Sequence, residues 1–323
     1  MSRPRVVLTR RWPAAVEGVL GERYELVPNA DDRPLGPDEF AHALATADAV
    51  CPTVTDVIDA ALFDRSPPRA RIVANFGVGF NHIDLEAARR AHVAVTNTPG
   101  VLTDCTADLA MTLMLMVARR TGEGERLVRE GTWSGWAPTQ LLGTRVSGKT
   151  LGLVGFGRIA RAVAARAHHG FGMRIRYFNP SAVPDAVTAQ LAAVACDDIE
   201  SLLETSDFVS LHCPGGAATR HLINAERLAR MPAHAYLVNT ARGEVVDQQA
   251  LIDALRARRI AGAGLDVYAG EPAVPMALKT LDNVVLLPHL GSATQETRVA
   301  MGLRVVANLD AFFAGREPPD RVA

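Results

Sequence analysis

Short runs of apolar and β-branched residues alternate with longer amphipathic stretches along almost the whole chain. In the first part of the chain the short runs predict strands at Arg5–Thr9, Tyr24–Val27, Ala49–Cys51, Ile72–Ala74 and Val93–Thr96. The stretches between them predict helices, for example at Pro37–Thr46 and Leu85–Ala91. Strands that alternate with helices in this way are typical of a parallel sheet with helices packed against it. The pattern therefore predicts an α/β fold.

The alternation is interrupted in the middle of the chain. The apolar segment Asp104–Arg120 predicts a long helix, with Thr103 or Asp104 as its N-cap. Six glycines and two tryptophans lie within the next segment, Thr121–Gly148, which is predicted to be an extended arm and not a packed βα unit. Regular alternation resumes after this arm, and a final long helix is predicted at Ala293–Gly315.

Length and composition bound the kind of protein. At 323 residues, the chain is long enough for about two domains. Its 48% hydrophobic and 21% charged residues are typical of a globular protein and exclude a disordered chain. The 34 basic and 35 acidic residues leave a net charge of -1, so charge gives no indication of binding to nucleic acid or to an anionic membrane surface.

Two further features bear on the cell compartment. The longest strongly apolar stretch, Leu109–Ala118, has about half the length needed to span a bilayer, and the N-terminus has no signal-peptide pattern. The four cysteines are far apart and form no CxxC pair, which argues against a disulfide framework and a structural zinc site. We therefore expect a cytoplasmic protein without a bound metal.

A glycine-rich turn follows the predicted strand Thr150–Val154. Its sequence, Gly155-Phe156-Gly157-Arg158-Ile159-Ala160, has the spacing G-x-G-x-x-A and leads into a predicted helix. In such a turn the first glycine permits a tight bend, the second lets backbone approach a pyrophosphate, and the small third residue lets helix and strand pack closely. The N–H groups at the helix start favour an anion. Between a strand and a helix, this spacing predicts a dinucleotide-binding site.

The residue that reads the adenosine ribose is expected at the end of the next strand, Arg174–Phe178, about 20 positions further on. Asn179 stands there. A carboxylate would bind the 2′-hydroxyl and repel a 2′-phosphate, and asparagine does neither strongly. No arginine follows directly, although Arg158 could lie nearby. The predicted cofactor is therefore NAD or NADP, and NADP stays open because Asn179 replaces the usual acidic residue. The alternative is that Asn179 is a polar turn residue without a selective role.

Three ionisable residues, Arg242, Glu271 and His289, each follow a predicted strand. These strands are predicted at Tyr236–Asn239, Gly262–Val267 and Val284–Leu287. Because the binding crevice of an open α/β sheet lies at the carboxyl ends of its strands, the three side chains are expected at one edge. Taken alone, each has a structural alternative: a surface turn, a loop start or a core histidine. Their common placement beside the glycine-rich turn favours a catalytic set.

These residue types fit the reduction of a 2-oxo acid. The reaction needs a hydride donor, a proton donor for the forming alkoxide, and a cation for the substrate carboxylate. Histidine can exchange a proton near neutral pH, and a neighbouring carboxylate orients the ring and favours the imidazolium form. Arginine offers a planar pair of donors that matches a carboxylate.

A second glycine turn lies in the first part of the chain, in the segment NFGVGFNHID at 75–84. Gly77 and Gly79 could expose backbone N–H groups that together bind an anion. An ordinary glycine turn is the alternative, and spacing alone does not decide between them.

Together, several segments resemble the D-isomer-specific 2-hydroxyacid dehydrogenase family, and within it the glyoxylate/hydroxypyruvate (D-glycerate) reductases. The matching segments are NFGVGFNHID (75–84), NTPGVLTDCTADLA (97–110), GKTLGLVGFGRIA (148–160), LVNTARGEVVD (237–247), GLDVYAGEP (264–272) and LLPHLGSAT (286–294). The resemblance covers nearly the whole chain, and the combination is far more specific than any one segment.

The resemblance implies two Rossmann-like doubly wound domains with parallel sheets, and an active site in the cleft between them. The substrate-binding domain would be discontinuous, formed by 1–98 plus 293–323. The dinucleotide-binding domain would be 99–292, with a dimerisation arm at about 103–148. It also implies a homodimer joined through this arm.

The resemblance further implies residue roles. His289 would be the acid–base catalyst, Glu271 its partner, and Arg242 the substrate clamp, with Arg242 and His289 both contacting substrate. The backbone of Val78 and Gly79 would bind the substrate carboxylate. Residues along the cofactor would be Thr106, Gly155, Gly157, Arg158, Ile159, Asn179, Cys213, Pro214, Thr219, Thr240, Ala241, Asp266 and Ser292. Of these, Asp266 would meet the nicotinamide carboxamide.

Some positions depart from the family pattern. Ala160 replaces the third glycine, which changes little. The loop that begins at Pro214 reads Pro-Gly-Gly-Ala-Ala in place of a Pro-Leu-Thr-Pro-like sequence, so this cofactor loop is expected to move. Gln140 falls where some glyoxylate reductases have an aromatic gate, which leaves their narrow substrate preference open.

The predicted function is NAD(P)H-dependent reduction of short 2-oxo acids, such as glyoxylate or hydroxypyruvate, to D-2-hydroxy acids. The partners would be these small acids, with no nucleic acid and no membrane. The alternative is a nucleotide-sensing, corepressor-like interaction protein on the same fold, and the intact set of Arg242, Glu271 and His289 disfavours it. Formate oxidation fits poorly with Glu271, because the related formate dehydrogenases carry a neutral residue there.

Overall fold

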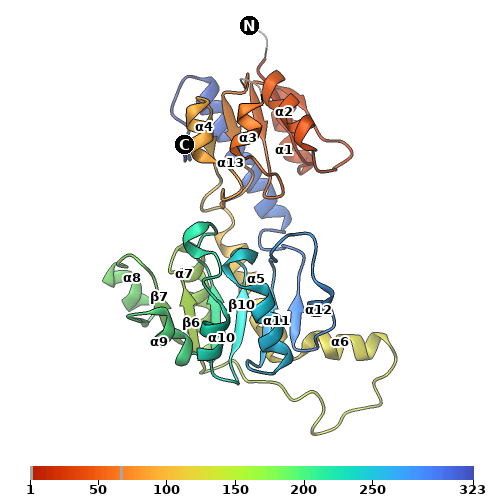
Figure 1. Ribbon diagram of the computed structural model, residues 1–323, viewed down its shortest axis with the longest axis vertical. Coiled ribbons are helices and arrows are strands. Elements are labelled where there is room, and N and C mark those ends of the chain that lie inside the picture. The colour runs from red at the N-terminus through yellow and green to blue at the C-terminus, as the bar shows by residue number, and fades with distance from the viewer. Residues whose placement is uncertain (1–2, 66–67) are drawn as a thin grey trace. The chain divides into compact units, whose positions relative to one another are not determined.

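The computed structural model describes residues 3–65 and 68–323. The chain forms two compact units (Figure 1), and the first contains both ends of the chain. Unit 1 comprises Met1–Leu102 and Ser292–Ala323, and unit 2 comprises Thr103–Gly291. The predicted domain boundaries fall after residues 98 and 292. An active site in the cleft between the two domains stays a prediction.

Unit 1 is built on a five-stranded parallel sheet with the order β2-β1-β3-β4-β5. The strands are β1 (Arg5–Leu8), β2 (Glu25–Val27), β3 (Ala49–Cys51), β4 (Ile72–Ala74) and β5 (Ala94–Thr96). All residues of β3, β4 and β5 are buried, as expected for parallel strands that are covered on both faces. The chain reverses its direction of winding between β1 and β3, which makes the unit doubly wound.

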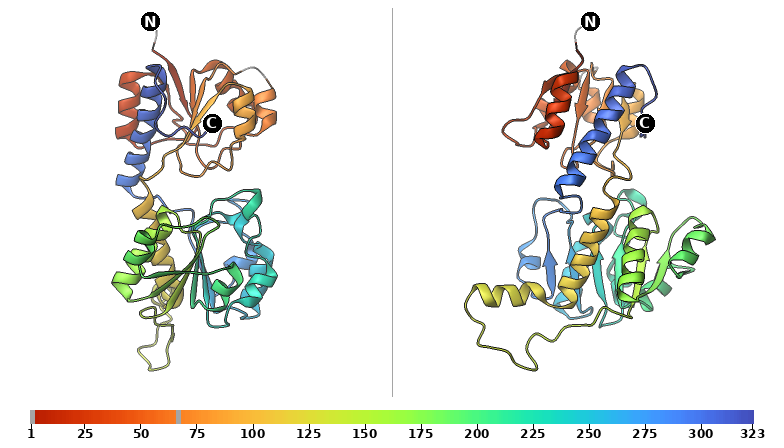
Figure 2. Two further views of the ribbon diagram at one scale, coloured as in Figure 1. Left: turned by 90° about the vertical axis from the view of Figure 1, so that its left-hand side faces the viewer. Right: turned by 180° about the vertical axis from the view of Figure 1, so that it is seen from behind.

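Helices cover both faces of this sheet (Figure 2). One face packs against α1 (Ala14–Arg23) and α13 (Gln295–Phe313), through side chains such as Leu20 and Val305. The other packs against α2 (Pro37–Thr46), α3 (Ala60–Asp64) and α4 (Leu85–Arg90). The C-terminal helix therefore completes a layer that the N-terminal segment begins, which explains why both chain ends belong to one unit.

Unit 2 is built on a seven-stranded parallel sheet with the order β12-β11-β10-β9-β6-β7-β8. The strands are β6 (Thr150–Val154), β7 (Arg174–Phe178), β8 (Ala193–Ala195), β9 (Phe208–Leu211), β10 (Tyr236–Asn239), β11 (Gly262–Leu265) and β12 (Val284–Leu286). Every residue of β6, β9, β10 and β11 is buried. The chain winds outward from β6 through β7 to β8, and then from β9 to β12 on the other side. The direction of winding thus switches between β6 and β9.

Two helical layers enclose this second sheet. On one face lie α5 (Thr103–Ala118), α7 (Arg158–Ala165), a π-helical turn (Arg166–Gly170) and α8 (Asp185–Gln190). On the other lie α9 (Ile199–Glu204), α10 (Ala225–Arg230), α11 (Gln248–Arg256) and α12 (Met276–Lys279). Two short 3-10 turns, Ala217–Thr219 and Gly243–Val245, lie in loops at the carboxyl edge of the sheet. The strand and helix pattern thus confirms the predicted α/β fold.

The segment after α5 differs from its prediction at the start. A helix, α6 (Thr121–Arg129), forms where an extended arm was expected, and only the remainder up to β6 has no helix or strand. The ion pairs Arg120–Glu123 and Arg129–Glu125 are at helical spacing and support α6 despite its two glycines. The predicted N-cap of α5 is also wrong, because the helix begins at Thr103 and both Thr103 and Asp104 lie in its first turn.

Candidate active site

The glycine-rich turn lies at the carboxyl end of β6, where the winding of unit 2 changes direction. Gly155 has a φ of +84°, and a Cβ there would lie 3.0 Å from the carbonyl oxygen of His212 and from the N of Cys213. Only glycine fits such a bend without strain. The turn after β6 and the loop after β9 therefore approach closely, at the position where doubly wound sheets bind nucleotides.

Several groups at the carboxyl edge of this sheet are open to a bound molecule. Gly157 is the residue before α7, and a Cβ added there would meet nothing within 4 Å, so the space on that side of the residue is open. Arg158 is exposed and Ile159 half-buried at the start of α7. The Oγ1 atom of Thr240 is buried and has no hydrogen-bond partner within residues 3–65 and 68–323, so it offers a polar group to a bound molecule.

Asn179 lies directly after β7 and contacts the glycine-rich turn. Its Oδ1 accepts a hydrogen bond from the N–H of Phe156 at 3.0 Å, and its Nδ2 donates to the carbonyl oxygen of Ser181 at 2.7 Å. The side chain therefore sits at the predicted ribose position but carries no charge that would repel a phosphate. Its role in coenzyme selection stays a prediction.

The loop after β9 contains three predicted cofactor residues. Burial raises the pKa of the Cys213 thiol to about 11, so the thiol is neutral at physiological pH. Thr219 donates from Oγ1 to the carbonyl oxygens of Pro214 at 2.6 Å and Gly216 at 3.3 Å. These bonds close the glycine-containing loop on itself. The expected movement of this loop is not tested.

Arg242 lies in a turn at the end of β10 that Asn239 holds from both sides. The Oδ1 of Asn239 accepts from the N–H of Ala241 at 3.0 Å, and its Nδ2 donates to the carbonyl oxygen of Arg242 at 2.9 Å. A Cβ on Gly243 would overlap the carbonyl carbon of Tyr268 at 1.9 Å. Glycine at 243 therefore lets the turn after β10 approach the loop after β11, which carries Glu271.

The electrostatics of Arg242 follow from this placement. Burial lowers the pKa of its guanidinium, while the negative charges of Glu244 and Glu271 raise it. An arginine nevertheless stays protonated in proteins. Arg242 is therefore a half-buried cation, close enough to Glu271 for the two charges to interact.

His289 and Glu271 form a direct pair at the same edge of the sheet. The Nδ1 of His289 lies 2.8 Å from Oε2 of Glu271, and the N–H of Tyr268 donates to Oε1 of Glu271 at 2.9 Å. Burial raises the pKa of Glu271, but the hydrogen bond and positive charge of His289, the Tyr268 N–H and the charge of Arg242 outweigh it and lower the pKa. Glu271 is therefore an ionised carboxylate that orients the imidazole.

Asp266 fixes the turn that carries His289. Its two carboxylate oxygens accept from the N–H groups of Leu290 at 2.6 Å and Gly291 at 2.8 Å, and its carbonyl oxygen accepts from the N–H of His289 at 2.9 Å. His289 itself has a φ of +56°, which is uncommon for a residue with a side chain. Burial raises the pKa of Asp266 more than these N–H donors and the charge of His289 lower it.

Thr106 also bonds to the turn that carries His289. Its Oγ1 donates to the carbonyl oxygen of Gly291 at 2.8 Å. Thr106 and Asp266 were expected only as cofactor contacts, and the structure shows that both bond to the segment after His289. Their predicted contacts with a cofactor stay predictions.

The predicted anion loop lies in unit 1, after β4. No hydrogen bond is found for the N–H groups of Val78 and Gly79 among the described residues. Both residues are half-buried.

Ser292 also belongs to unit 1 and not to the unit that contains the glycine-rich turn. Its predicted contact with the cofactor stays a prediction.

Sequence reasoning did not predict the side-chain bonds that hold these loops. Asn239 bonds the Arg242 turn, Asp266 bonds the His289 turn, and Asn75 bonds the anion loop. Asn239 carried a usable signal, because an asparagine at the start of a turn often bonds backbone a few residues on. The contacts of Asp266 join residues 24 and 25 positions apart, so no local pattern reveals them.

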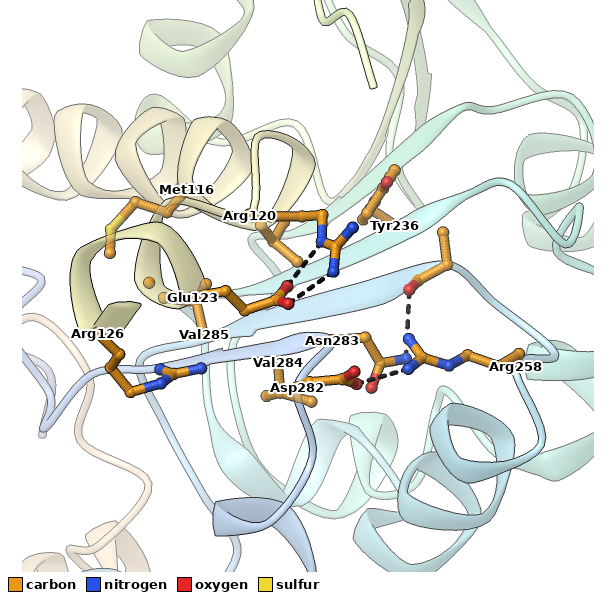
Figure 3. A pocket seen from close by; sticks show the side chains of 13 residues that line it. Met116, Arg120, Glu123, Arg126, Tyr236, Arg258, Asp282, Asn283, Val284 and Val285 are labelled. Atoms are coloured by element: carbon orange, nitrogen blue, oxygen red, sulfur yellow. Dashed lines mark hydrogen bonds and ion pairs between the residues drawn. The ribbon is translucent and has the colours of Figure 1, made fainter. Parts of the chain in front are cut away.

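A pocket of about 300 Å³ lies in unit 2 at the amino edge of its sheet, opposite the carboxyl edge that carries Arg242, Glu271 and His289 (Figure 3). It is lined at the amino ends of the strands, for example by Tyr236 and Val284, and by α6. Its charged groups include the bonded pairs Arg120–Glu123 and Arg258–Asp282. None of the predicted catalytic residues lines this pocket, so it is separate from the candidate active site.

Within residues 3–65 and 68–323, no helix has the length and apolar character needed to cross a membrane. The same residues contain no group of three or more histidine, cysteine, aspartate or glutamate side chains arranged to hold a metal ion.

Comparison with known proteins identifies relatives of the whole chain. The profile described as D-isomer specific 2-hydroxyacid dehydrogenase, NAD binding domain, matches residues 111–291. A glyoxylate reductase of Korarchaeum cryptofilum is 46% identical over 99% of this chain and 96% of its own length.

Solved structures agree with this result. The TT0316 protein from Thermus thermophilus has a TM-score of 0.90 and 44% identity, covering 99% of this chain and 100% of its own. An NADPH-dependent glyoxylate/hydroxypyruvate reductase from Sinorhizobium meliloti, solved with NADP and malonate, has a TM-score of 0.86 and 36% identity, covering 100% of this chain and 97% of its own. The chain belongs to the D-isomer specific 2-hydroxyacid dehydrogenase family and is an oxidoreductase.

Proposed function

We propose that the protein reduces short 2-oxo acids, such as glyoxylate or hydroxypyruvate, to D-2-hydroxy acids with His289 as the proton donor. The observation that carries this function is the 2.8 Å contact between His289 Nδ1 and Glu271 Oε2, at the same carboxyl edge of the sheet as the glycine-rich turn. The names of the relatives support the substrate class, since one is a glyoxylate reductase and another a glyoxylate/hydroxypyruvate reductase.

The bonded pair determines which ring atom exchanges a proton. Glu271 Oε2 accepts from Nδ1 of His289, so Nε2 is left to donate a proton to the substrate oxygen. When bound, the reduced nicotinamide supplies a hydride to the carbonyl carbon. In the reverse direction Nε2 would accept the proton of the hydroxyl group, and Glu271 would stabilise the imidazolium that forms.

Two groups are proposed to bind the carboxylate of the substrate. The guanidinium of Arg242 offers a planar set of donors from the end of β10. The N–H groups of Val78 and Gly79 offer neutral donors from unit 1, which bind a carboxylate without themselves titrating. A substrate that lacks the carboxylate should therefore be a poor one.

The cofactor is proposed to be NAD or NADP, held by the turn Gly155–Gly157, Thr240 and Asn179. The relative from Sinorhizobium meliloti uses NADPH, which makes NADP the first coenzyme to test. The absence of a carboxylate at Asn179 supports the same choice, because no negative charge there opposes a 2′-phosphate.

A homodimer joined through the segment at about 103–148 is also proposed. Within this segment Trp136 is 81% exposed, Leu142 66% and Trp133 53%. Several large apolar side chains exposed on one loop are a feature of protein interfaces.

A cytoplasmic location is also proposed. The four cysteines are all free, as expected in a reducing compartment.

The direct test is an activity assay on a panel of 2-oxo acids, with NADPH and with NADH. Turnover is measured as the loss of absorbance of the reduced coenzyme. We expect oxidation with glyoxylate and hydroxypyruvate, and a D-configured product with hydroxypyruvate. If neither coenzyme is oxidised with any 2-oxo acid, the proposed function is wrong. Coenzyme binding without turnover would favour the nucleotide-sensing alternative.

A further inference from the structure

Three successive carbonyl groups of the loop after β4 point to buried side-chain amides. Asn75 donates from Nδ2 to the carbonyl oxygens of Gly77 at 3.1 Å and Gly79 at 3.0 Å. Asn97 donates from Nδ2 to the carbonyl oxygen of Val78 at 2.8 Å. The carbonyls of residues 77, 78 and 79 are therefore all held on the inner side of the loop.

The direction of the N–H groups follows from the planarity of the peptide bond. In a trans peptide, the C=O of one residue and the N–H of the next point in opposite directions. Because the carbonyls of Gly77 and Val78 are turned toward the buried amides, the N–H groups of Val78 and Gly79 are turned away from them. These are the two N–H groups for which no hydrogen bond is found within the described residues.

Asn75 is itself held in place. Asn75 is fully buried, and its Oδ1 lies 3.1 Å from Nε2 of His82, which is on the same loop. The main chain supports this arrangement, because the N–H of Thr98 also donates to the carbonyl oxygen of Gly77 at 3.0 Å. The side-chain amide of Asn75 thus bonds to Gly77 and Gly79 in the middle of the loop and to His82 near its end.

We propose that Asn75 is a positioning residue that presents the Val78 and Gly79 N–H groups to the carboxylate of the substrate, with Asn97 in a smaller supporting role. This role rests on the proposed function, since it assigns the loop to the same substrate. Asn75 does not touch the substrate. Without it, the carbonyl of Gly79 loses its side-chain donor and that of Gly77 keeps only the Thr98 N–H, so the peptide planes of the loop are held less firmly.

The first variant is Asn75→Ala, compared with Asn29→Ala. Asn29 is a matched control because its Nδ2 also donates to two backbone carbonyls of unit 1, those of Thr9 and Arg33, both at 2.7 Å, in a loop without a proposed anion site. For Asn75→Ala we expect the KM for glyoxylate to rise at least about tenfold with kcat changed by less than about threefold, the pattern of lost uniform binding. Asn29→Ala should leave both near the wild-type values.

A second measurement does not depend on turnover. The Kd for oxalate, a dicarboxylate probe, is measured by calorimetry with oxidised coenzyme present, and the Kd for the coenzyme alone is measured in parallel. Asn75→Ala should weaken oxalate binding at least about tenfold and leave the coenzyme Kd unchanged, because the glycine-rich turn lies in the other unit. If Asn75→Ala does not fold, Asn97→Ala should show the same split with a smaller change.

The possible results test the positioning role of Asn75 separately from the proposed reductase function. A folded Asn75→Ala variant whose oxalate Kd and glyoxylate KM are within about twofold of wild type overturns the positioning role. An equal loss of coenzyme and oxalate binding also overturns it, since that result indicates general damage. If wild type binds oxalate but reduces no 2-oxo acid, the proposed function fails while the oxalate measurement still judges Asn75.

Discussion

The imidazole of His289 and the carboxylate of Glu271 are joined at 2.8 Å, and the second carboxylate oxygen is bonded to the N–H of Tyr268. The carboxylate is thus fixed between main chain and ring, and its pKa is lowered although burial opposes ionisation. An ionised carboxylate in this position favours the ring form that carries a hydrogen on Nδ1. This pairing gives the first prediction.

Replacing Glu271 with glutamine should lower kcat/KM for glyoxylate by at least about tenfold and leave the coenzyme Kd nearly unchanged. Glutamine keeps the size of the side chain and can still accept from Nδ1, but it has no negative charge, and its amide can turn to present a donor that cannot bond the Nδ1–H group. The measurement is kcat/KM for glyoxylate and the coenzyme Kd for both proteins at one pH. Equal kcat/KM values in wild type and variant would show that the carboxylate does not orient the ring.

Replacing His289 with alanine should lower kcat by at least about 100-fold and leave the coenzyme Kd nearly unchanged. His234→Ala is a matched control, because its Nε2 lies 3.0 Å from Oδ1 of Asp207, yet this pair precedes β9 and β10 at the amino edge of the sheet. That variant should keep wild-type turnover. Near-normal kcat in His289→Ala would remove this residue from catalysis.

The sequence allowed the strands and the positions of the catalytic residues to be predicted for a clear physical reason. Buried parallel strands are short apolar runs, and a residue that follows such a run must lie at the carboxyl edge. Arg242, Glu271 and His289 could therefore be assigned to one edge of unit 2, where the structure has them after β10, β11 and β12.

The remaining features depend on contacts that no local pattern encodes. Helix α6 was not expected because its glycines disfavour helix, but ion pairs at helical spacing support it. Asp266 reaches a turn far along the chain, and the role of Asn75 depends on how the main chain of its own loop is folded. Such bonds become visible only when the backbone path is known.

His212 should make unit 2 less stable in acid. Burial lowers the pKa of its imidazole from 6.5 to about 4, and its Nε2 lies 2.9 Å from Oγ of Ser210. Below pH 6.5 the unfolded chain binds a proton that the folded chain does not, so this contribution to stability is present above pH 6.5 and is lost as the pH falls toward 4. The residue keeps some exposed surface, so we expect a loss of about 1 kcal/mol at about pH 5.

The check is calorimetry of wild type and His212→Gln without coenzyme at about pH 8 and about pH 5, on either side of the ordinary histidine pKa. A loss of this size lowers the Tm of a unit of this length by about 2–4 °C. The Tm of wild type should therefore fall further than that of the variant between the two pH values. Equal falls in both proteins would mean that His212 titrates normally in the fold.

Asn179 should control the choice of coenzyme. Aspartate at this position can still accept from the N–H of Phe156, but it loses the donor to Ser181 and gains a negative charge. That charge repels a 2′-phosphate and can accept from the 2′-hydroxyl of NADH. In Asn179→Asp, the ratio of kcat/KM for NADPH to that for NADH should therefore fall at least about tenfold.

Asn224→Asp is the control for added charge, because Asn224 caps α10 through its Oδ1 and aspartate serves equally well as a cap. Its coenzyme ratio should equal that of wild type. Initial rates with saturating glyoxylate and varied NADPH or NADH give both ratios directly. If Asn179→Asp leaves the ratio unchanged while turnover is retained, the ribose is read by residues other than Asn179, and exposed Arg158 at the start of α7 becomes the next position to vary.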